Sequence, residues 1–246
     1  MWRGLWKLTW LETKIFLREP LGVVGTIGIP ILVFLILRRI GRGAPSGAVP
    51  ALLGSDLPIF AAVMVSVSAV VSLVAIIAIY REGGILKRLR ATPLQPVTIL
   101  LAHVLVKLGF TALSLLTLML LGARTFGAGA ATSVLSFGIA LLFTTLCLLS
   151  IGFIIASVVP TARFAQPLAS LVIYAMLGLS GLFVPLDRLP PLVQTLARLL
   201  PMSYAVSLLR GVWRGDGWLA HSSELAVMAL MFAVATAISA RVFRWE

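Results

Sequence analysis

The chain has 246 residues, of which 60% are hydrophobic and 11% charged, and its mean hydropathy is +1.10. These values lie outside the range of soluble domains and predict an all-α polytopic integral membrane protein with room for about six spans of roughly 20 residues each. The net charge of +12 does not indicate nucleic-acid binding, because the basic residues lie at the edges of apolar runs, where anionic lipid headgroups account for them.

The first 19 residues combine tryptophans with regularly spaced basic side chains. On a helix of 3.6 residues per turn, one narrow stripe holds Arg3, Lys7, Lys14 and Arg18. Tryptophan favours the headgroup region, and basic residues favour the anionic inner leaflet. The pattern predicts an amphipathic interfacial helix over residues 1–19; a loosely ordered tail is the alternative.

Six apolar runs come next in the chain and predict six transmembrane helices. Residues 38–56, rich in Gly and Pro, predict an irregular loop after the first run. The six runs cover residues 21–37, 57–80, 97–121, 132–159, 163–183 and 219–240.

The segment 184–217 is too broken to span a membrane and too apolar for a soluble loop. Its prolines are Pro185, Pro190, Pro191 and Pro201. Two short re-entrant helices before the last span fit this pattern, because irregular backbone at membrane depth must be buried in protein or line a watery cavity.

The basic residues beside the spans predict the orientation. With a cytoplasmic N-terminus, eleven of them lie inside and eight outside, and four of the outer eight belong to the long segment where the positive-inside rule has less weight. We therefore expect both termini in the cytoplasm and residues 184–217 on the extracellular side.

Motifs for enzyme chemistry are missing from the sequence. It contains no GxxxxGK[ST] phosphate-binding loop, no HExxH, no GxSxG and no Cys/His cluster with zinc spacing. His103 and His221 fall on opposite sides of the predicted membrane, and Cys147 lies within an apolar run. We expect neither a metal site nor catalysis in this chain.

One ionisable residue, Lys107, falls deep in a predicted span, one turn after His103. A charged side chain at such depth costs roughly 2.5 to 3.5 kcal/mol on insertion scales and is a functional candidate. The favoured interpretation is that Lys107 extends back to the interface while His103 lies among headgroups. The alternative is that the pair faces a substrate path or a subunit interface.

The most polar segment between two spans is "REGGILKRLRATPLQP", residues 81–96. Gly83 and Gly84 permit a sharp exit from the second span. The next residues predict a short helix with an apolar ridge and a basic rim, which Thr92 and Pro93 end. Such a helix is suited to docking against a partner; a positive-inside anchor without a partner is the alternative.

These residues resemble those of the permease subunits of ABC type 2 transporters, the bacterial exporters of drugs, antibiotics and polysaccharides. The likeness rests on "REGGILKRLRATPLQP" after the second span and on "SGLFVPLDRLPPLVQTLARLLPMSYAVSLLRGV", residues 180–212. It covers essentially the whole chain and implies a single ABC type 2 transmembrane domain over residues 1–246. Gly84 and the short linkers depart from the common pattern.

The resemblance implies roles for residues and partners. The re-entrant segment would contain Pro185, Pro190, Pro201 and Tyr204 at matching positions. Two copies of a separate ATP-binding subunit, which hold ATP and Mg, would drive two permeases paired as a homodimer or heterodimer in the inner or plasma membrane of a prokaryote. The residues implied to couple the permease to the ATPase are Glu82, Gly83, Leu86, Lys87, Arg88, Leu89, Arg90, Thr92 and Pro93.

The expected function is therefore ATP-driven export of a hydrophobic or amphipathic, drug-like or antibiotic-like compound. A secondary transporter without an ATPase is the first alternative, with Lys107 as its coupling residue. A membrane assembly protein whose polar loop recruits another soluble partner is the second.

Overall fold

The computed structural model describes residues 2–43, 57–84, 96–122, 134–159 and 161–242. These ranges form helices and turns and contain no strand, in agreement with the predicted all-α class. Four helices are long and apolar enough to cross a membrane, or five if the bent pair α9 and α10 counts as one span. The four are α4 (Leu57–Glu82), α6 (Pro96–Gly122), α7 (Val134–Val158) and α11 (Ser222–Val242).

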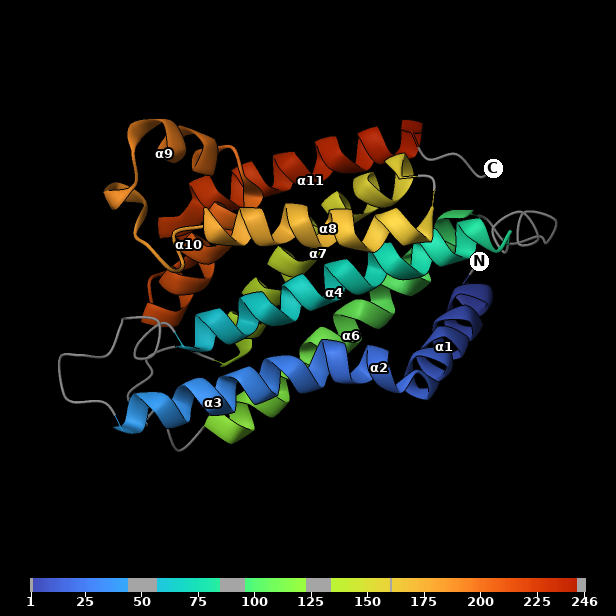
Figure 1. Cartoon of the computed structure of the whole chain (residues 1–246), viewed down its shortest axis with the longest axis horizontal. Helices are drawn as coiled ribbons and strands as arrows, with labels where there is room; N and C mark the ends of the chain where they lie inside the picture. The colour runs from blue at the N-terminus through green and yellow to red at the C-terminus, as the bar shows by residue number, and fades with distance from the viewer. Residues whose placement is uncertain (1, 44–56, 85–95, 123–133, 160, 243–246) are drawn as a thin grey trace.

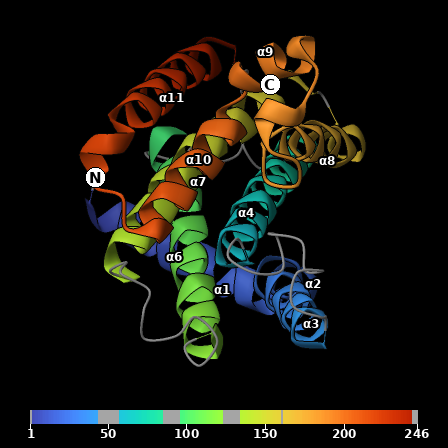
Figure 2. The ribbon, with the colours of Figure 1, turned by 90° about the vertical axis from the view of Figure 1, so that its left-hand side faces the viewer.

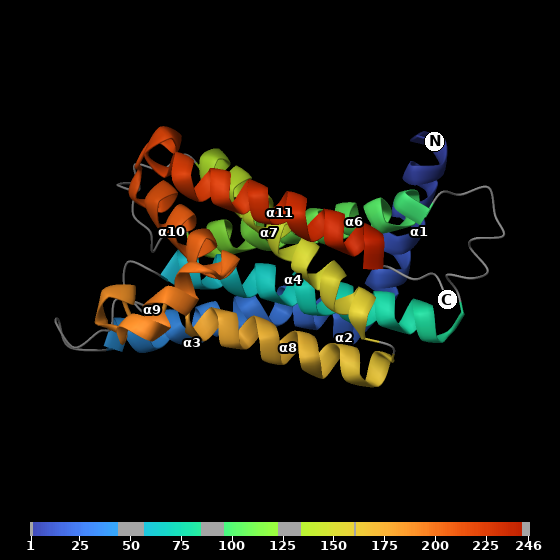
Figure 3. The ribbon, with the colours of Figure 1, turned by 90° about the horizontal axis from the view of Figure 1, so that it is seen from above.

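The long helices lie lengthwise beside one another, and α1 (Trp2–Arg18) packs at an angle against α6 (Figures 1 and 3). At the end where α1 lies, α4 ends, α6 begins and α11 ends (Figure 1). We call this the α1 end, and the opposite end, where α9 and α10 lie, the α10 end. The helices that carry the two termini therefore share one end of the bundle.

Two further helical stretches run along the bundle (Figure 1). One is a continuous helical path in which a π-helical segment, η1 (Val24–Gly28), joins α2 (Pro20–Val23) to α3 (Ile29–Gly43). The other is α8 (Ala162–Gly178), which has 17 residues. The helix of α3 continues to residue 43, so the prediction of irregular backbone from residue 38 is wrong for residues 38–43. A hydrogen bond from Arg38 to the carbonyl of Leu121 in α6, at 2.9 Å, supports the helix there.

The core lies where α4 meets α7, which are apolar all round and therefore suit a central position. Small residues allow the helices to approach closely, as is typical of helix packing in membranes. Gly152 of α7 faces Val70 of α4, and a Cβ at residue 152 would lie 3.0 Å from the Val70 side chain. Fully buried alanines also occur on these two helices: Ala62, Ala69, Ala140 and Ala156.

At the α10 end, prolines start the short helices in the segment where re-entrant helices were predicted. Proline suits a first helical turn because the amide it lacks would have no helical partner there. α9 (Pro191–Arg198) and α10 (Pro201–Arg214) meet at 82°. Figure 2 shows α10 in front of α7. The bend is held by Ser203 Oγ, which donates to the Ala197 carbonyl at 2.7 Å, and by Tyr204 Oη, which donates to the Arg198 carbonyl at 2.8 Å.

Gly211 of α10 provides a test of this packing. A Cβ at residue 211 would overlap the ring of His221, which η4 (Trp218–His221) presses against α10. We expect Gly211→Ala to lower the thermal midpoint of the detergent-purified protein, with an overpacking cost of about 1 to 3 kcal/mol. The matched control is Gly109→Ala, because a Cβ there meets nothing within 4 Å. Equal midpoints for the two variants would contradict the close approach of η4 to α10.

Candidate functional site

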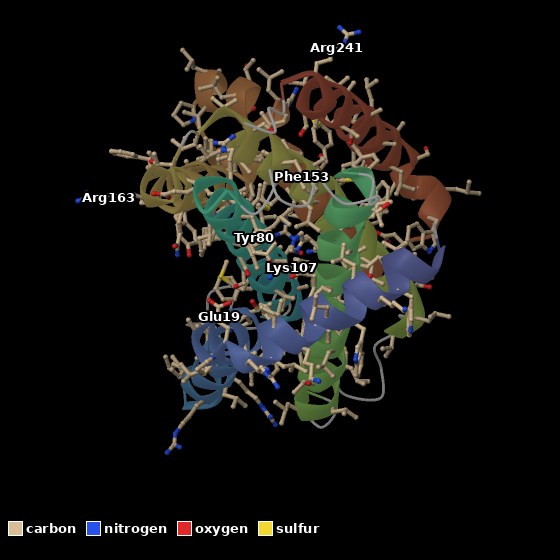
Figure 4. The ribbon with its side chains drawn as sticks, turned by 90° about the vertical axis from the view of Figure 1, so that its right-hand side faces the viewer. Glu19, Tyr80, Lys107, Phe153, Arg163 and Arg241 are labelled. Atoms are coloured by element: carbon tan, nitrogen blue, oxygen red, sulfur yellow. The ribbon has the colours of Figure 1, made fainter. Side chains whose placement is uncertain are left out.

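Polar side chains from three helices, three of them buried and two half-buried, meet near the α1 end, and we call this group the polar junction. Figure 4 shows Tyr80 and Lys107 in the interior, whereas Arg163 and Arg241 extend outward. The junction consists of Glu12 from α1, Ser72 and Tyr80 from α4, and His103 and Lys107 from α6.

The spacing of residues on α1 explains how a carboxyl group comes to be buried. Leu8, Glu12 and Phe16 are four apart and share one face of the helix. This face packs on α6, with Leu8 against Ala102 and Phe16 in a cluster with Phe110, at 4.5 Å between ring centroids. Two tryptophans of α1 point the other way: Trp6 is 74% exposed and Trp10 is 64% exposed.

Glu12 links all three helices and is only 5% exposed. The hydroxyl of Tyr80 donates to both carboxyl oxygens of Glu12, at 3.1 and 3.2 Å. Nδ1 of His103 lies 3.5 Å from Oε2 of Glu12, and the His103 ring meets Tyr80 edge-on at 5.2 Å. The Glu12 carboxyl group is therefore held by partners on both α4 and α6.

Lys107 is the largest charged side chain in the interior of the described ranges, at 2% exposure. Its Nζ donates to Oγ of Ser72 at 2.6 Å and lies 4.1 Å above the ring of Phe16. A cation over an aromatic face gains about 2 kcal/mol when both are desolvated. These contacts offset part of the cost of burying the ammonium group.

Electrostatics at Glu12 reflect this burial. Loss of hydration raises the pKa of the Glu12 carboxyl above its ordinary value of 4.5, whereas the hydrogen bond from Tyr80 and the charge of Lys107 act in the opposite direction. Because its pKa is raised, a larger fraction of Glu12 is protonated at a given pH than of an exposed glutamate.

The structure differs from the favoured interpretation of Lys107 and His103. The Lys107 ammonium does not extend to the surface, because α1 covers this part of α6 and Ser72 accepts its hydrogen bond. His103 is 3% exposed and lies between Tyr80 and Glu12. The sequence alone singled out these two residues, but it did not identify Glu12, Tyr80 or Ser72. The spacing of Leu8, Glu12 and Phe16 on one helical face was the available signal for Glu12.

Only the start of the predicted coupling segment lies in the described part of the chain. α4 ends at Glu82, which is exposed, and the amides of Gly83 and Gly84 bond back to the carbonyls of Ile79 and Arg81. Gly84 has φ +65°, a left-handed conformation that glycine adopts without a Cβ penalty. The other predicted coupling residues lie outside the described residues: Leu86, Lys87, Arg88, Leu89, Arg90, Thr92 and Pro93.

The residues singled out in the re-entrant segment all lie at the α10 end. Pro185 precedes the 3-10 turn η3 (Leu186–Arg188), Pro190 precedes α9, and Pro201 begins α10. Tyr204 ties α10 to α9 through its hydroxyl. The starts of α9 and α10 and the bend between these helices bring the four residues to the end of the bundle opposite the polar junction.

A second polar group at the α10 end was not predicted. The His221 ring lies between two carboxyl groups, with Nε2 3.5 Å from Asp216 and Nδ1 3.4 Å from Glu224. Ser207 and Ser223 also donate to Glu224, at 3.1 and 2.7 Å. Among the described residues, no group of three or more His, Cys, Asp or Glu side chains could hold a metal ion.

The fold and the polar junction define a multi-pass α-helical membrane protein whose buried ionisable groups join helices to one another by hydrogen bonds. The chain belongs to the ABC-2 type transporter family, which it matches over residues 3–213. This match confirms the resemblance found in the sequence and identifies the chain as a membrane permease of that family.

Curated relatives that share one name match shorter parts of the chain. Nodulation protein J of Rhizobium leguminosarum bv. trifolii is 36% identical over 72 residues, which are 29% of this chain and 28% of the relative. Nodulation protein J of Sinorhizobium fredii is 30% identical over 118 residues, which are 47% of this chain and 45% of the relative. The aligned part thus spans less than half the length of each relative.

The raised pKa of Glu12 predicts a pH effect that can be isolated in one variant. The pKa of Glu12 is higher in the folded protein than in the unfolded chain. Protonated Glu12 therefore makes its full contribution to the free energy of unfolding below pH 4.5, and this contribution is lost as the pH rises through the pKa of Glu12 in the folded protein. Glu12→Gln keeps an acceptor for Tyr80 and removes the titration. We expect the thermal midpoint of the wild type to fall relative to that of Glu12→Gln as pH rises from about 4 to about 8.

The control for this experiment is Asp187→Asn, which neutralises an exposed carboxyl at the α10 end. Measuring the midpoint difference from the wild type cancels the titration of the other groups. A difference between the wild type and Glu12→Gln that stays constant over the pH range would contradict the burial of a titrating carboxyl in the junction.

Proposed function

We propose that this protein is the membrane-spanning permease subunit of an ATP-driven exporter that moves a hydrophobic or amphipathic, drug-like or antibiotic-like compound out of a prokaryotic cell. The observation that carries this proposal is the family match over residues 3–213. The sequence contains no phosphate-binding loop, so ATP and Mg are assigned to a separate ATP-binding subunit. Two copies of that subunit would serve two permeases.

We extend the proposal to six spans, with the whole of residues 1–246 as one transmembrane domain. The path from α2 to α3 and the 17-residue α8 lie lengthwise beside the four helices that are long enough by themselves (Figure 1). A span needs about 17 to 25 residues, depending on tilt. An even number of crossings agrees with the positions of α1 and of the last turn of α11 at the same end of the bundle.

In this proposal the α1 end faces the cytoplasm and α1 lies along the inner leaflet. Lys7, Lys14 and Arg18 are exposed on α1, as a helix beside anionic lipid requires. The segment 81–96 leaves α4 at the same end and would dock into the ATPase subunit. The segment 184–217 at the α10 end would form the re-entrant structure on the outer side.

The substrate class is inferred from the apolar character of the spans, which suits a compound with a large apolar part better than a strongly charged one. The name of the relatives, Nodulation protein J, does not state a substrate. The two permeases would pair as a homodimer, or as a heterodimer with a related chain.

The first test is an affinity purification of the tagged protein from its native membrane in mild detergent. We expect an ATP-binding subunit with a phosphate-binding loop to co-purify and to hydrolyse ATP. Reversing two charges of the coupling segment, Arg88→Glu with Arg90→Glu, should remove most of the bound ATPase activity and leave membrane insertion intact. The reason is that a basic rim favours a complementary acidic groove.

The matched control is Arg188→Glu with Arg198→Glu, which reverses two exposed charges at the α10 end. This variant should retain the ATPase. Equal retention by both variants would remove the docking role of residues 81–96. Purification of the wild-type chain without an ATPase would contradict the proposal of an ATP-driven exporter and would favour a secondary transporter. The buried Lys107 would then be the residue to substitute next.

A further inference from the structure

The last turn of α4 holds two consecutive side chains that bind different parts of the bundle. Tyr80 donates to Glu12 of α1 at 3.1 and 3.2 Å. Nη1 of Arg81 donates to the carbonyl of Ser157, at the end of α7, at 3.1 Å. Consecutive helical residues point about 100° apart, so the two contacts diverge from one turn. Glu82 comes next and ends the helix.

The Tyr80 contact connects α4 to α1 and α6 together. Its acceptor, Glu12, is buried, and the His103 ring of α6 lies edge-on against Tyr80 while its Nδ1 faces Glu12. A shift of α4 along its axis would therefore strain contacts with both neighbouring helices, because a buried polar group that loses its partner pays the full cost of its desolvation.

The Arg81 contact connects α4 to α7 and α11. Ser157 is the next-to-last residue of α7, so its carbonyl belongs to the last turn, whose carbonyls have no partner within the helix. The negative end of the helix dipole also favours a guanidinium group there. Oγ of Ser157 lies 3.3 Å from Oγ of Ser239 on α11, which extends the connection to the last helix.

These contacts differ in kind from the apolar contacts of the core, and α4 makes two further hydrogen bonds of this kind along its length, Ser66 with Thr145 and Ser72 with Lys107. Apolar faces in a bilayer gain no hydrophobic driving force from meeting one another, because lipid tails are as apolar as leucine, so their close packing alone holds them together. Directed hydrogen bonds fix the register between helices. At the last turn of α4, hydrogen bonds fix the register of α4 relative to α1 and α6 on one side and relative to α7 and α11 on the other.

We propose that Tyr80 and Arg81 are the positioning residues that transmit movement of the segment after α4 into the bundle along two separate connections. Tyr80 transmits it to α1 and α6, and Arg81 transmits it to α7 and α11. This inference rests on the proposed function, in which an ATPase docks on residues 81–96. It assigns the coupling step to side chains at the end of α4, where the docking segment begins.

The experiment is hydrogen–deuterium exchange of the permease–ATPase complex in nanodiscs, compared with and without ATP, Mg and orthovanadate. In the wild type we expect trapping to change exchange both in α1 and at the end of α7. Tyr80→Phe removes one hydroxyl and should abolish the change in α1 while preserving the change in α7. Arg81→Met keeps the apolar stem and should do the reverse.

Matched controls are Tyr174→Phe on α8 and Arg241→Met on α11, both of which alter exposed side chains. Both should respond as the wild type does. Arg81→Lys, which keeps a cationic donor, should restore part of the α7 response. In a transport assay with a fluorescent amphipathic dye, each of Tyr80→Phe and Arg81→Met should lower dye export per ATP hydrolysed by about fivefold or more.

The outcomes separate this inference from the proposed function. If no ATPase is present in the wild-type complex, the proposed function fails. If the ATPase binds and hydrolyses ATP but both variants keep both exchange responses, the role of Tyr80 and Arg81 is wrong. Loss of both responses in either variant would also overturn the proposal, because it would show a single common connection or a general disruption.

Discussion

Burial of ionisable groups where α1, α4 and α6 meet is the constraint on which the α1 end of the structure depends. An ammonium group and a carboxyl group taken out of water need partners at fixed positions, since an unpaired charge in the interior costs several kcal/mol. Lys107 and Glu12 obtain these partners from helices other than their own. Consequently, if α1 left the bundle, polar groups on both α4 and α6 would be exposed or would lose their partners.

The two ends of the bundle are stabilised by different means. At the α1 end, side-chain hydrogen bonds join helices that are distant in sequence, such as the bond between residues 12 and 80. At the α10 end, prolines begin short helices and the bend of 82° is held by bonds to carbonyls only six residues away. Longer-range hydrogen bonds add to these local ones at the α10 end: Arg38 donates to the Leu121 carbonyl at 2.9 Å, and Arg210 donates to the Gly181 carbonyl at 3.3 Å.

Between the ends, packing is apolar and close. Gly152 and the small buried residues of α4 and α7 bring the two central helices together, and Ser66 and Thr145 add a buried hydrogen bond between their hydroxyls at 2.8 Å. A well-packed apolar centre behaves as a rigid unit, because protein interiors resist small changes in volume. Rigid central helices allow a displacement at the last turn of α4 to reach distant parts of the bundle.

The sequence by itself determined most of the helical segments, though not the continuation of α3 to residue 43, because length, apolar content and proline position are local properties. It also singled out His103 and Lys107, since an ionisable residue in an apolar run is visible without a structure. The tertiary structure decided what those residues contact. Glu12 meets Tyr80 68 positions away in sequence, and Arg81 reaches a carbonyl 76 positions away. Helical periodicity describes which residues share a face, but not which faces meet. The prediction that Lys107 extends to the interface was wrong for this reason: its surroundings were set by α1, whose packing on α6 no local pattern specifies.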